Sequence, residues 1–267
     1  MLNNITLGQY YQVDSVIHRM DPRVKLTATF VYIISLFIVD NYIGYIIAAA
    51  FLAMCIALSK VPVKFMVRGL KGIVVFLVIA SCFNLFMVPG EELVSFWKLT
   101  ITKEGLLLAT KMIIRLIFLI MGSSVMTLTT TPNNLTDGLE SILKPLKIIK
   151  VPVHEISMMM SIALRFIPIL VEETDKIMKA QMARGVDFEN GGLIRKVKSM
   201  VPLLVPLFVS AFRRANDLAM AMEARCYMGG EGRTKMKPLK YAKRDFMAYL
   251  SLCIYLALCI VIGRILL

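Results

Sequence analysis

Two arginine residues stand in the same short sequence context, 41 residues apart along the chain. The first context is Ala180-Gln-Met-Ala183-Arg184 and the second is Ala221-Met-Glu-Ala224-Arg225. The small alanines let a partner's backbone approach closely, and the planar guanidinium group can bind a carboxylate or carbonyl groups through two hydrogen bonds. The alternative is helix capping, in which an arginine in the last turn contributes roughly 0.3–1 kcal/mol. Because the whole context is repeated, we interpret both arginines as docking residues for a two-fold partner.

The residue after each arginine influences how the helix ends. Gly185 follows Arg184, and glycine adopts the left-handed conformation that terminates a helix without a steric clash. Cys226 follows Arg225, so we expect the second helix to stop later, at Gly229-Gly230. The predicted docking residues are the two triplets at the helix ends, Ala183, Arg184, Gly185, Ala224, Arg225 and Cys226.

Patterns for catalysis or cofactor binding do not occur in the sequence. It has no Gly-x-x-x-x-Gly-Lys-Ser/Thr loop for nucleotide phosphates, no His/Glu pattern for zinc and no Gly-x-Ser-x-Gly turn of hydrolases. His18 and His154 are isolated, and four of the five cysteines lie in apolar runs, where cysteine behaves as a small hydrophobic residue. We therefore expect a protein that is not an enzyme and has no cofactor, no metal site and no disulfide framework.

Apolar and basic residues are both abundant and occupy different parts of the chain. Hydrophobic residues make up 58% of the 267 residues, and 31 Lys and Arg against 18 Asp and Glu give a formal net charge of +13. Apolar segments separated by basic loops are typical of a polytopic membrane protein. A basic chain could also bind nucleic acid, but the membrane interpretation requires no such partner. We predict an all-α polytopic fold in a lipid bilayer, without nucleic acid.

Five apolar segments could cross a bilayer, which requires about 20 helical residues. The predicted spans are Val24–Val39, Tyr42–Leu58, Gly72–Val88, Gly105–Thr131 and Phe246–Ile262. The fourth contains Lys111 and Arg115, which lie four residues apart and share one helix face. Either these two charges serve a function inside the membrane, or the span begins after Arg115.

The charges of the loops orient these spans. Ser59–Lys71 holds four basic residues and no acidic residue, whereas Pro89–Glu104 is slightly acidic, so we place the first inside the cell and the second outside. Counting spans then places the N-terminus and Pro132–Arg244 in the cytoplasm, and that segment holds 19 Lys and Arg against 11 Asp and Glu. The predicted parts are a four-span bundle (1–131), a cytoplasmic domain (132–244) and a C-terminal span (245–267).

Two long helices dominate the predicted cytoplasmic domain. The first, Pro152–Arg184, should be kinked at Pro168 and about 50 Å long at about 1.5 Å per residue. The second is Arg195–Met228, with Pro202 and Pro206 in its first turns. Because prolines and charges interrupt their apolar runs, we expect neither helix to form a comfortable span.

Methionine is concentrated in these two helices. Nine of the 19 methionines fall between Met158 and Met228. Flexible methionine side chains suit an interface that accepts several partners, although gap-filling in an ordinary helix–helix core explains them equally well. Residues assigned to a second predicted interface are Met158, Met159, Met160, Pro168 and Pro206.

The chain resembles the transmembrane coupling subunit of energy-coupling factor (ECF) transporters, the EcfT/CbiQ family, over nearly its whole length. The resemblance rests on His18-Arg-Met-Asp21-Pro22-Arg23-Val-Lys25-Leu, on Leu164-Arg165-Phe166-Ile-Pro168 and on the two arginine tips. At the second tip, Cys226 replaces the glycine of the family pattern.

This resemblance implies a four-part transporter at the cell membrane. Two cytoplasmic ATP-binding-cassette ATPases would each receive one arginine-tipped helix. A separate membrane protein, the exchangeable S-component, would bind a vitamin or a transition-metal ion and would contact the second predicted interface. The alternatives are a self-contained secondary permease, which would transport without ATPases, and a membrane enzyme, which the missing catalytic patterns disfavour.

Overall fold

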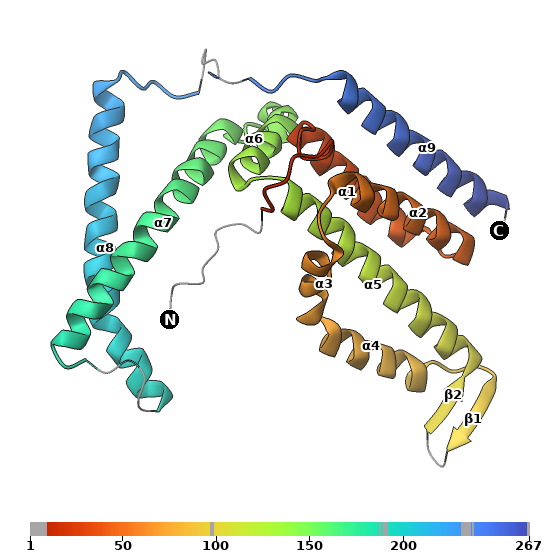
Figure 1. The fold of residues 1–267 in the computed structure, drawn as a ribbon. Helices are drawn as coiled ribbons and strands as arrows, with labels where there is room; N and C mark the ends of the chain where they lie inside the picture. The colour runs from red at the N-terminus through yellow and green to blue at the C-terminus, as the bar shows by residue number, and fades with distance from the viewer. Residues whose placement is uncertain are drawn as a thin grey trace. The chain divides into compact units, whose positions relative to one another are not determined.

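Helices form most of the part of the chain that the structure describes (Figure 1). This computed structural model describes residues 10–96, 99–186, 188, 192–230, 236 and 238–265. The chain divides into two units, the first combining residues 8–141 with 239–267 and the second comprising residues 142–238. The predicted all-α polytopic fold class is confirmed.

The first unit is built around four long helices. They are α1 (Pro22–Ile38), α2 (Tyr42–Ser59), α5 (Lys103–Thr129) and α9 (Lys243–Ile265). α9 follows the second unit in the sequence, yet it packs against α1 and α2. The C-terminal helix therefore belongs to the same bundle as the N-terminal helices.

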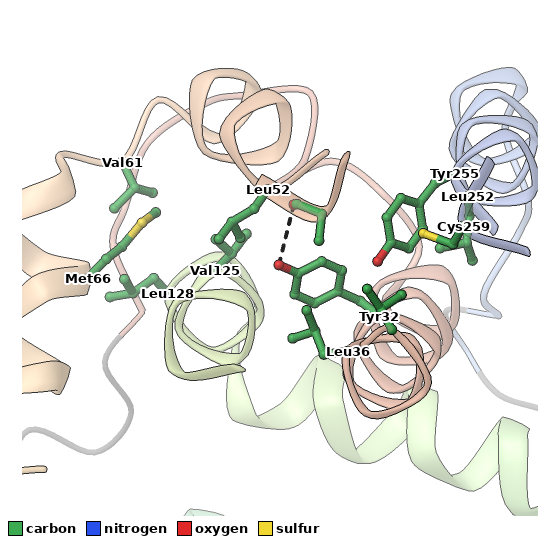
Figure 2. Close-up of a cluster of buried hydrophobic side chains, with 12 residues drawn as sticks. Tyr32, Leu36, Leu52, Val61, Met66, Val125, Leu128, Leu252, Tyr255 and Cys259 are labelled. Atoms are coloured by element: carbon green, nitrogen blue, oxygen red, sulfur yellow. Dashed lines mark hydrogen bonds between the residues drawn. The ribbon is translucent and has the colours of Figure 1, made fainter. Parts of the chain in front are cut away.

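A cluster of buried side chains, mostly aliphatic and including the rings of Tyr32 and Tyr255, fills the centre of this bundle (Figure 2). Tyr32 of α1 is buried and its hydroxyl donates to the carbonyl of Ala48 at 3.5 Å. Tyr255 of α9 stacks on Phe51 of α2, with ring centroids 4.6 Å apart, and its hydroxyl lies 2.6 Å from the hydroxyl of Ser35. These contacts join α1, α2 and α9 through residues that are polar only at their tips, which suits an apolar environment.

The segment between α2 and α5 differs from the predicted single span and loop. α3 (Val63–Lys71) and α4 (Val74–Met87) together are long enough to cross a membrane, but they meet at a bend of 61°. Residues predicted as a loop contain a short antiparallel hairpin, β1 (Glu92–Phe96) and β2 (Leu99–Thr102), while Lys98 lies outside the described residues. Asn84 on α4 donates to the sulfur of Met112 on α5 at 2.9 Å, so α4 is held along α5.

Several described helices are long and apolar enough to cross a membrane by length and composition. They are α2, α5, α9 and α7 (Val153–Ala183), with the bent pair α3 and α4 as a fifth candidate. α1 has 17 residues, the lower end of the usual range of roughly 17–25. The two long helices between Pro132 and Arg244 were not expected to form comfortable spans, yet α7 is long and apolar enough by length and composition, because Pro168 does not interrupt the helix.

The second unit consists of a short 3-10 helix, η1 (Lys144–Ile149), and two long helices, α7 and α8 (Leu193–Ala224). α6 (Pro132–Leu143) leads into it from the first unit. α7 agrees with its predicted bounds within one residue at each end, and Pro202 and Pro206 lie inside α8. The pair runs antiparallel and crosses, as Figure 1 shows.

Candidate functional site: two arginine tips on crossed helices

The two arginine tips have the same backbone geometry. At the end of α7, the amide of Gly185 donates to the carbonyl of Met182 at 2.9 Å and the amide of Val186 donates to the carbonyl of Gln181 at 3.1 Å. At the end of α8, the amides of the two residues after Arg225 donate to carbonyls at the same spacings, at 2.8 and 3.0 Å. Both sets of bonds form the Schellman motif, with the arginine as the last half-helical residue.

The second tip corrects the expected position of the helix end. α8 ends at Ala224 and does not continue to Gly229-Gly230, because Cys226 itself takes the left-handed conformation with φ 54°. Gly185 occupies the equivalent place in the first tip with φ 87°. Left-handed backbone costs a residue with a Cβ atom roughly 1–2 kcal/mol, so the second tip adopts the common geometry against an intrinsic preference.

All six predicted docking residues are exposed in the described structure. The side chains of Arg184 and Arg225 are both exposed, as are the alanines before them. A guanidinium group at a helix C-terminus stands next to carbonyl groups that carry partial negative charge. Each tip therefore presents a solvated cation beside a small residue, and it can accept a carboxylate from another protein.

A polar contact joins α7 and α8 where they cross. The carboxylate of Glu173 on α7 accepts from Arg214 Nη2 at 2.7 Å and from the hydroxyl of Ser210, both on α8. We call this set the crossing lock. Further along the pair, the amide of Gln181 donates to the carbonyl of Pro202 at 3.4 Å, so the freed carbonyl near a helix proline has a partner.

Beside the crossing lock the helices leave a cavity of about 300 Å³. Phe166 and Leu170 line it from α7, and Leu218 and Met222 line it from α8. Ala211, Ala215 and Ala219 face it as well, so α8 presents small residues there. The contact between the helices is consequently polar at the lock and has an apolar pocket, open to one side, next to it.

The second predicted interface lies partly on the surface. Met159 is 57% exposed and Met160 is 38% exposed, whereas Met158 is half-buried. Pro168 is exposed and Pro206 is half-buried, so the two prolines are not equally accessible to a partner. A wider apolar stripe runs along α8, with Leu204, Val205, Phe208, Val209 and Phe212 all at least 45% exposed.

Sequence reasoning did not identify the crossing lock. Glu173 stands beside Glu172, and Arg214 beside Arg213, so the sequence contains two adjacent acids and two adjacent bases. Glu172 and Arg213 are exposed, while Glu173 and Arg214 are half-buried against each other. These adjacent charges indicated that the two helices could form an ion pair. Which acid meets which base depends on the register between α7 and α8, which the sequence does not give.

The two charges in the fourth predicted span have a structural explanation. Arg115 donates to the carboxylate of Asp40 at 3.1 Å, to the carbonyl of Val39 at 3.3 Å and to the hydroxyl of Tyr45 at 3.2 Å. The ammonium group of Lys111 lies 5.6 Å from the centre of the Tyr42 ring. Both side chains thus fasten α5 to the turn between α1 and α2.

Comparison with known proteins identifies the family of the chain. The model of the CbiQ family, described as cobalt transport protein, matches residues 14–236. The energy-coupling factor transporter transmembrane protein EcfT of Clostridium kluyveri is 54% identical, over 99% of this chain and 98% of that protein. The EcfT proteins of Bacillus subtilis and Lactococcus lactis are 44% and 42% identical, over 97% and 99% of this chain and 98% and 100% of those proteins.

The apolar helices and these matches define a multi-pass transport protein of the cell membrane. The chain belongs to the family of energy-coupling factor transporter transmembrane proteins, EcfT/CbiQ. The resemblance inferred from the sequence is therefore confirmed.

Proposed function

We propose that the chain is the coupling subunit of an ECF importer and that each arginine tip docks one of two cytoplasmic ATP-binding-cassette ATPases. The observation that carries the proposal is the repetition of one backbone motif, with an exposed arginine, at the ends of two crossed helices. A repeated docking element suits a partner that presents the same surface twice. ATP hydrolysis belongs to those ATPases, and this chain is a non-catalytic subunit.

The crossing lock links the two tips mechanically. Glu173 on α7 holds Ser210 and Arg214 on α8, so the separation of Arg184 and Arg225 depends on the angle at which the helices cross. Closure of an ATPase dimer on ATP would move its two docking surfaces relative to each other. The pair of helices would convert that movement into a change of crossing angle, for which the adjacent cavity leaves room.

A substrate-binding S-component would contact the apolar surface of the same two helices. Met159 and Met160 on α7 and the apolar stripe on α8 expose large hydrophobic side chains. Such amphipathic helices lie at the inner membrane face by burying their apolar side. A methionine-containing surface that can repack would serve several S-components in turn, each for its own vitamin or metal ion.

Affinity purification from the native membrane tests the proposed function. The unaltered chain should bring down two ATPase subunits and one substrate-binding membrane protein. Replacement of Met158, Met159 and Met160 by Asp should lose the membrane protein and keep the ATPases, because charges replace the exposed apolar side chains of Met159 and Met160 while the tips are unchanged. Quantitative mass spectrometry of the purified complexes measures both. A chain that purifies alone and still transports would instead be a self-contained permease.

The proposed orientation places the N-terminus and residues 132–244 in the cytoplasm. In a chain without its native cysteines, a cysteine at Asp40 or Gly90 should react with a membrane-impermeant maleimide in intact cells. Cysteines at Lys147 and at Gly191, which lies outside the described residues, should react only after permeabilisation. Labelling of position 191 from outside would mean that α7 crosses the membrane and that this orientation is wrong.

A further inference from the structure

The segment from His18 to Leu26 supplies a motif that the docking of ATPases does not explain. It ends the N-terminal stretch and begins α1 in the first unit. We propose that this end of α1 is an anchor that holds both chain connections of the second unit, so that movement of the coupling helices enters the membrane bundle at α1. This inference rests on the proposed function and concerns the transmission of movement, which is separate from docking.

The outgoing connection is α6, and it packs directly on the first turn of α1. A Cβ atom added at Gly138 would stand 3.1 Å from Leu26 Cδ1 and 3.1 Å from Pro22 Cβ, and 3.2 Å from the backbone carbon of Pro22. Thr136 beside it is only 2% exposed. Glycine suits this close approach, because a Cβ atom here would be tighter than an ordinary van der Waals contact and the neighbouring atoms of α1 would have to give by a few tenths of an ångström.

The returning connection is held by a buried carboxylate. Asp245, at the start of α9, is 1% exposed, and its two oxygens accept from the amide of Asp21 at 2.9 Å and from the amide of Ala242 at 2.7 Å. A buried carboxylate is stable only when such partners satisfy it. Asp245 therefore fixes the chain that returns from the second unit to the residue that precedes α1.

Arg23 adds a second contact between the start of α1 and the segment that returns from the second unit. Asp21 caps α1 by accepting from the amide of Arg23 at 2.9 Å, and it binds the guanidinium group of Arg23 at 2.8 and 3.0 Å. The same guanidinium lies 4.0 Å from the centre of the Tyr241 ring, the distance of a cation–π contact. Asp21 and Arg23 thus join the start of α1 to Asp245 and to Tyr241, respectively.

A lysine on α1 holds the end of α5, where α6 begins. Lys25 is 8% exposed, and its ammonium group donates to the carbonyl of Thr129 at 2.8 Å and to the carbonyl of His18 at 3.2 Å. The Thr129 carbonyl is among those that the helix leaves without an internal partner. The outgoing connection is consequently held twice, by Gly138 and by Lys25.

His18 stabilises the stretch that leads to this anchor. Burial lowers the pKa of its imidazole, so the ring is neutral at pH 7. Its Nε2 lies 2.9 Å from the Tyr11 carbonyl, which can only accept, so Nε2 donates and Nδ1 accepts from the hydroxyl of Ser15 at 2.7 Å. The nine residues 18–26 therefore hold α5, α6 and the start of α9 through separate contacts.

A fluorescence experiment tests the anchor in the complete transporter. The chain is purified with its bound ATPases and S-component in lipid nanodiscs, with Cys226 replaced by Gly and the other four cysteines by Ala. A bimane fluorophore is attached to Phe30→Cys on α1, whose native side chain is 58% exposed. ATP should change the fluorescence in this parent protein, and phosphate release gives the rate of hydrolysis in the same sample.

Asp245→Asn should separate the two readouts. We expect the variant to retain its ATPases and their hydrolysis rate, while the ATP-dependent fluorescence change falls roughly tenfold or more, as expected for loss of a charged hydrogen-bond acceptor. Tyr241→Ala removes the half-exposed ring, and with it the cation–π contact to Arg23 and the contacts to Phe246 and Tyr249, so it should reduce the change roughly two- to fivefold. Tyr241→Ala also keeps the test decisive if the asparagine variant does not fold.

Asp14→Asn is the matched control. Asp14 pairs with Arg19 in the same N-terminal stretch, but both side chains are more than 60% exposed, so the parent response should be kept. The inference is overturned if Asp245→Asn and Tyr241→Ala keep the full fluorescence change, if hydrolysis falls in equal proportion, or if ATP causes no change in the parent. Failure of the proposed function would be seen differently, as ATPases that remain bound after both arginine tips are reversed.

Discussion

The double variant Arg184→Glu with Arg225→Glu is expected to purify from the membrane without its ATPases. Each substitution replaces an exposed guanidinium group with a charge that repels the carboxylate expected on the partner. Loss of one desolvated charge contact at an interface typically costs roughly 2–5 kcal/mol. The double variant loses both contacts, and the remaining contacts of the helix ends cannot compensate for that loss of binding free energy. The complex should therefore separate, while the chain still inserts into the membrane.

The single variants should show that the tips act together. A partner bound at two linked sites gains roughly 10²–10⁴ in apparent affinity over one site, so either substitution alone should abolish coupled uptake. Immunoblotting of the purified complex and uptake by whole cells measure the two effects. Lys147→Glu makes the same change of charge in η1, before the opposite end of α7, and it should leave the complex intact. Normal transport by the double variant would rule out docking at the tips.

Charge reversal at one residue of the crossing lock should weaken ATPase binding, and a second reversal at its partner should restore that binding. Glu173→Arg brings two arginines together where the helices cross, and Arg214→Glu brings two acids together. Either change should weaken ATPase binding because the tips no longer have the separation that bivalent docking requires. The combined swap re-forms an ion pair, so it should recover most of the binding, with a coupling energy of roughly 0.5–3 kcal/mol.

A neighbouring pair provides the control for the lock. Glu172 and Arg213 lie one residue earlier on the same two helices and are exposed. Reversing their charges alters the same residue types without reaching the crossing, so ATPase binding should not change. Titration of purified ATPases onto the immobilised chain gives the affinities for all variants. Equal losses in the lock variants, their swap and the control would show that charge alone determines the result.

Composition and periodicity were enough to predict the helical architecture. The length of an apolar run such as Tyr42–Leu58 predicts a membrane-spanning helix, and the structure has a helix at Tyr42–Ser59. Proline was a weaker guide. Pro168 lies inside a continuous 31-residue helix, so the run that appeared broken in the sequence is long enough to span. The position of α7 relative to the bilayer therefore stays a prediction from loop charge.

Contacts between distant residues were beyond the reach of the sequence. The antiparallel pairing of β1 with β2 places Glu92 opposite Thr102, and no alternating pattern in the sequence indicated it. The crossing lock joins residues 41 positions apart, and its formation depends on the register between α7 and α8. The helix end at Arg184 was predictable because its signal is local, whereas the end at Ala224 was not, since it depends on the left-handed conformation of Cys226; the docking role of both tips stays a prediction.

Cys226 also makes the two helix ends chemically different. The first carries Gly185 and the second an exposed free thiol, in otherwise matching hydrogen-bonded turns. The other cysteines of the described chain all lie within the apolar helices α2, α4 and α9. A water-soluble thiol reagent therefore addresses one arm of the crossed pair and leaves its counterpart unmodified. A label on the native Cys226 would therefore report partner binding at the end of α8 alone, without any substitution at the end of α7.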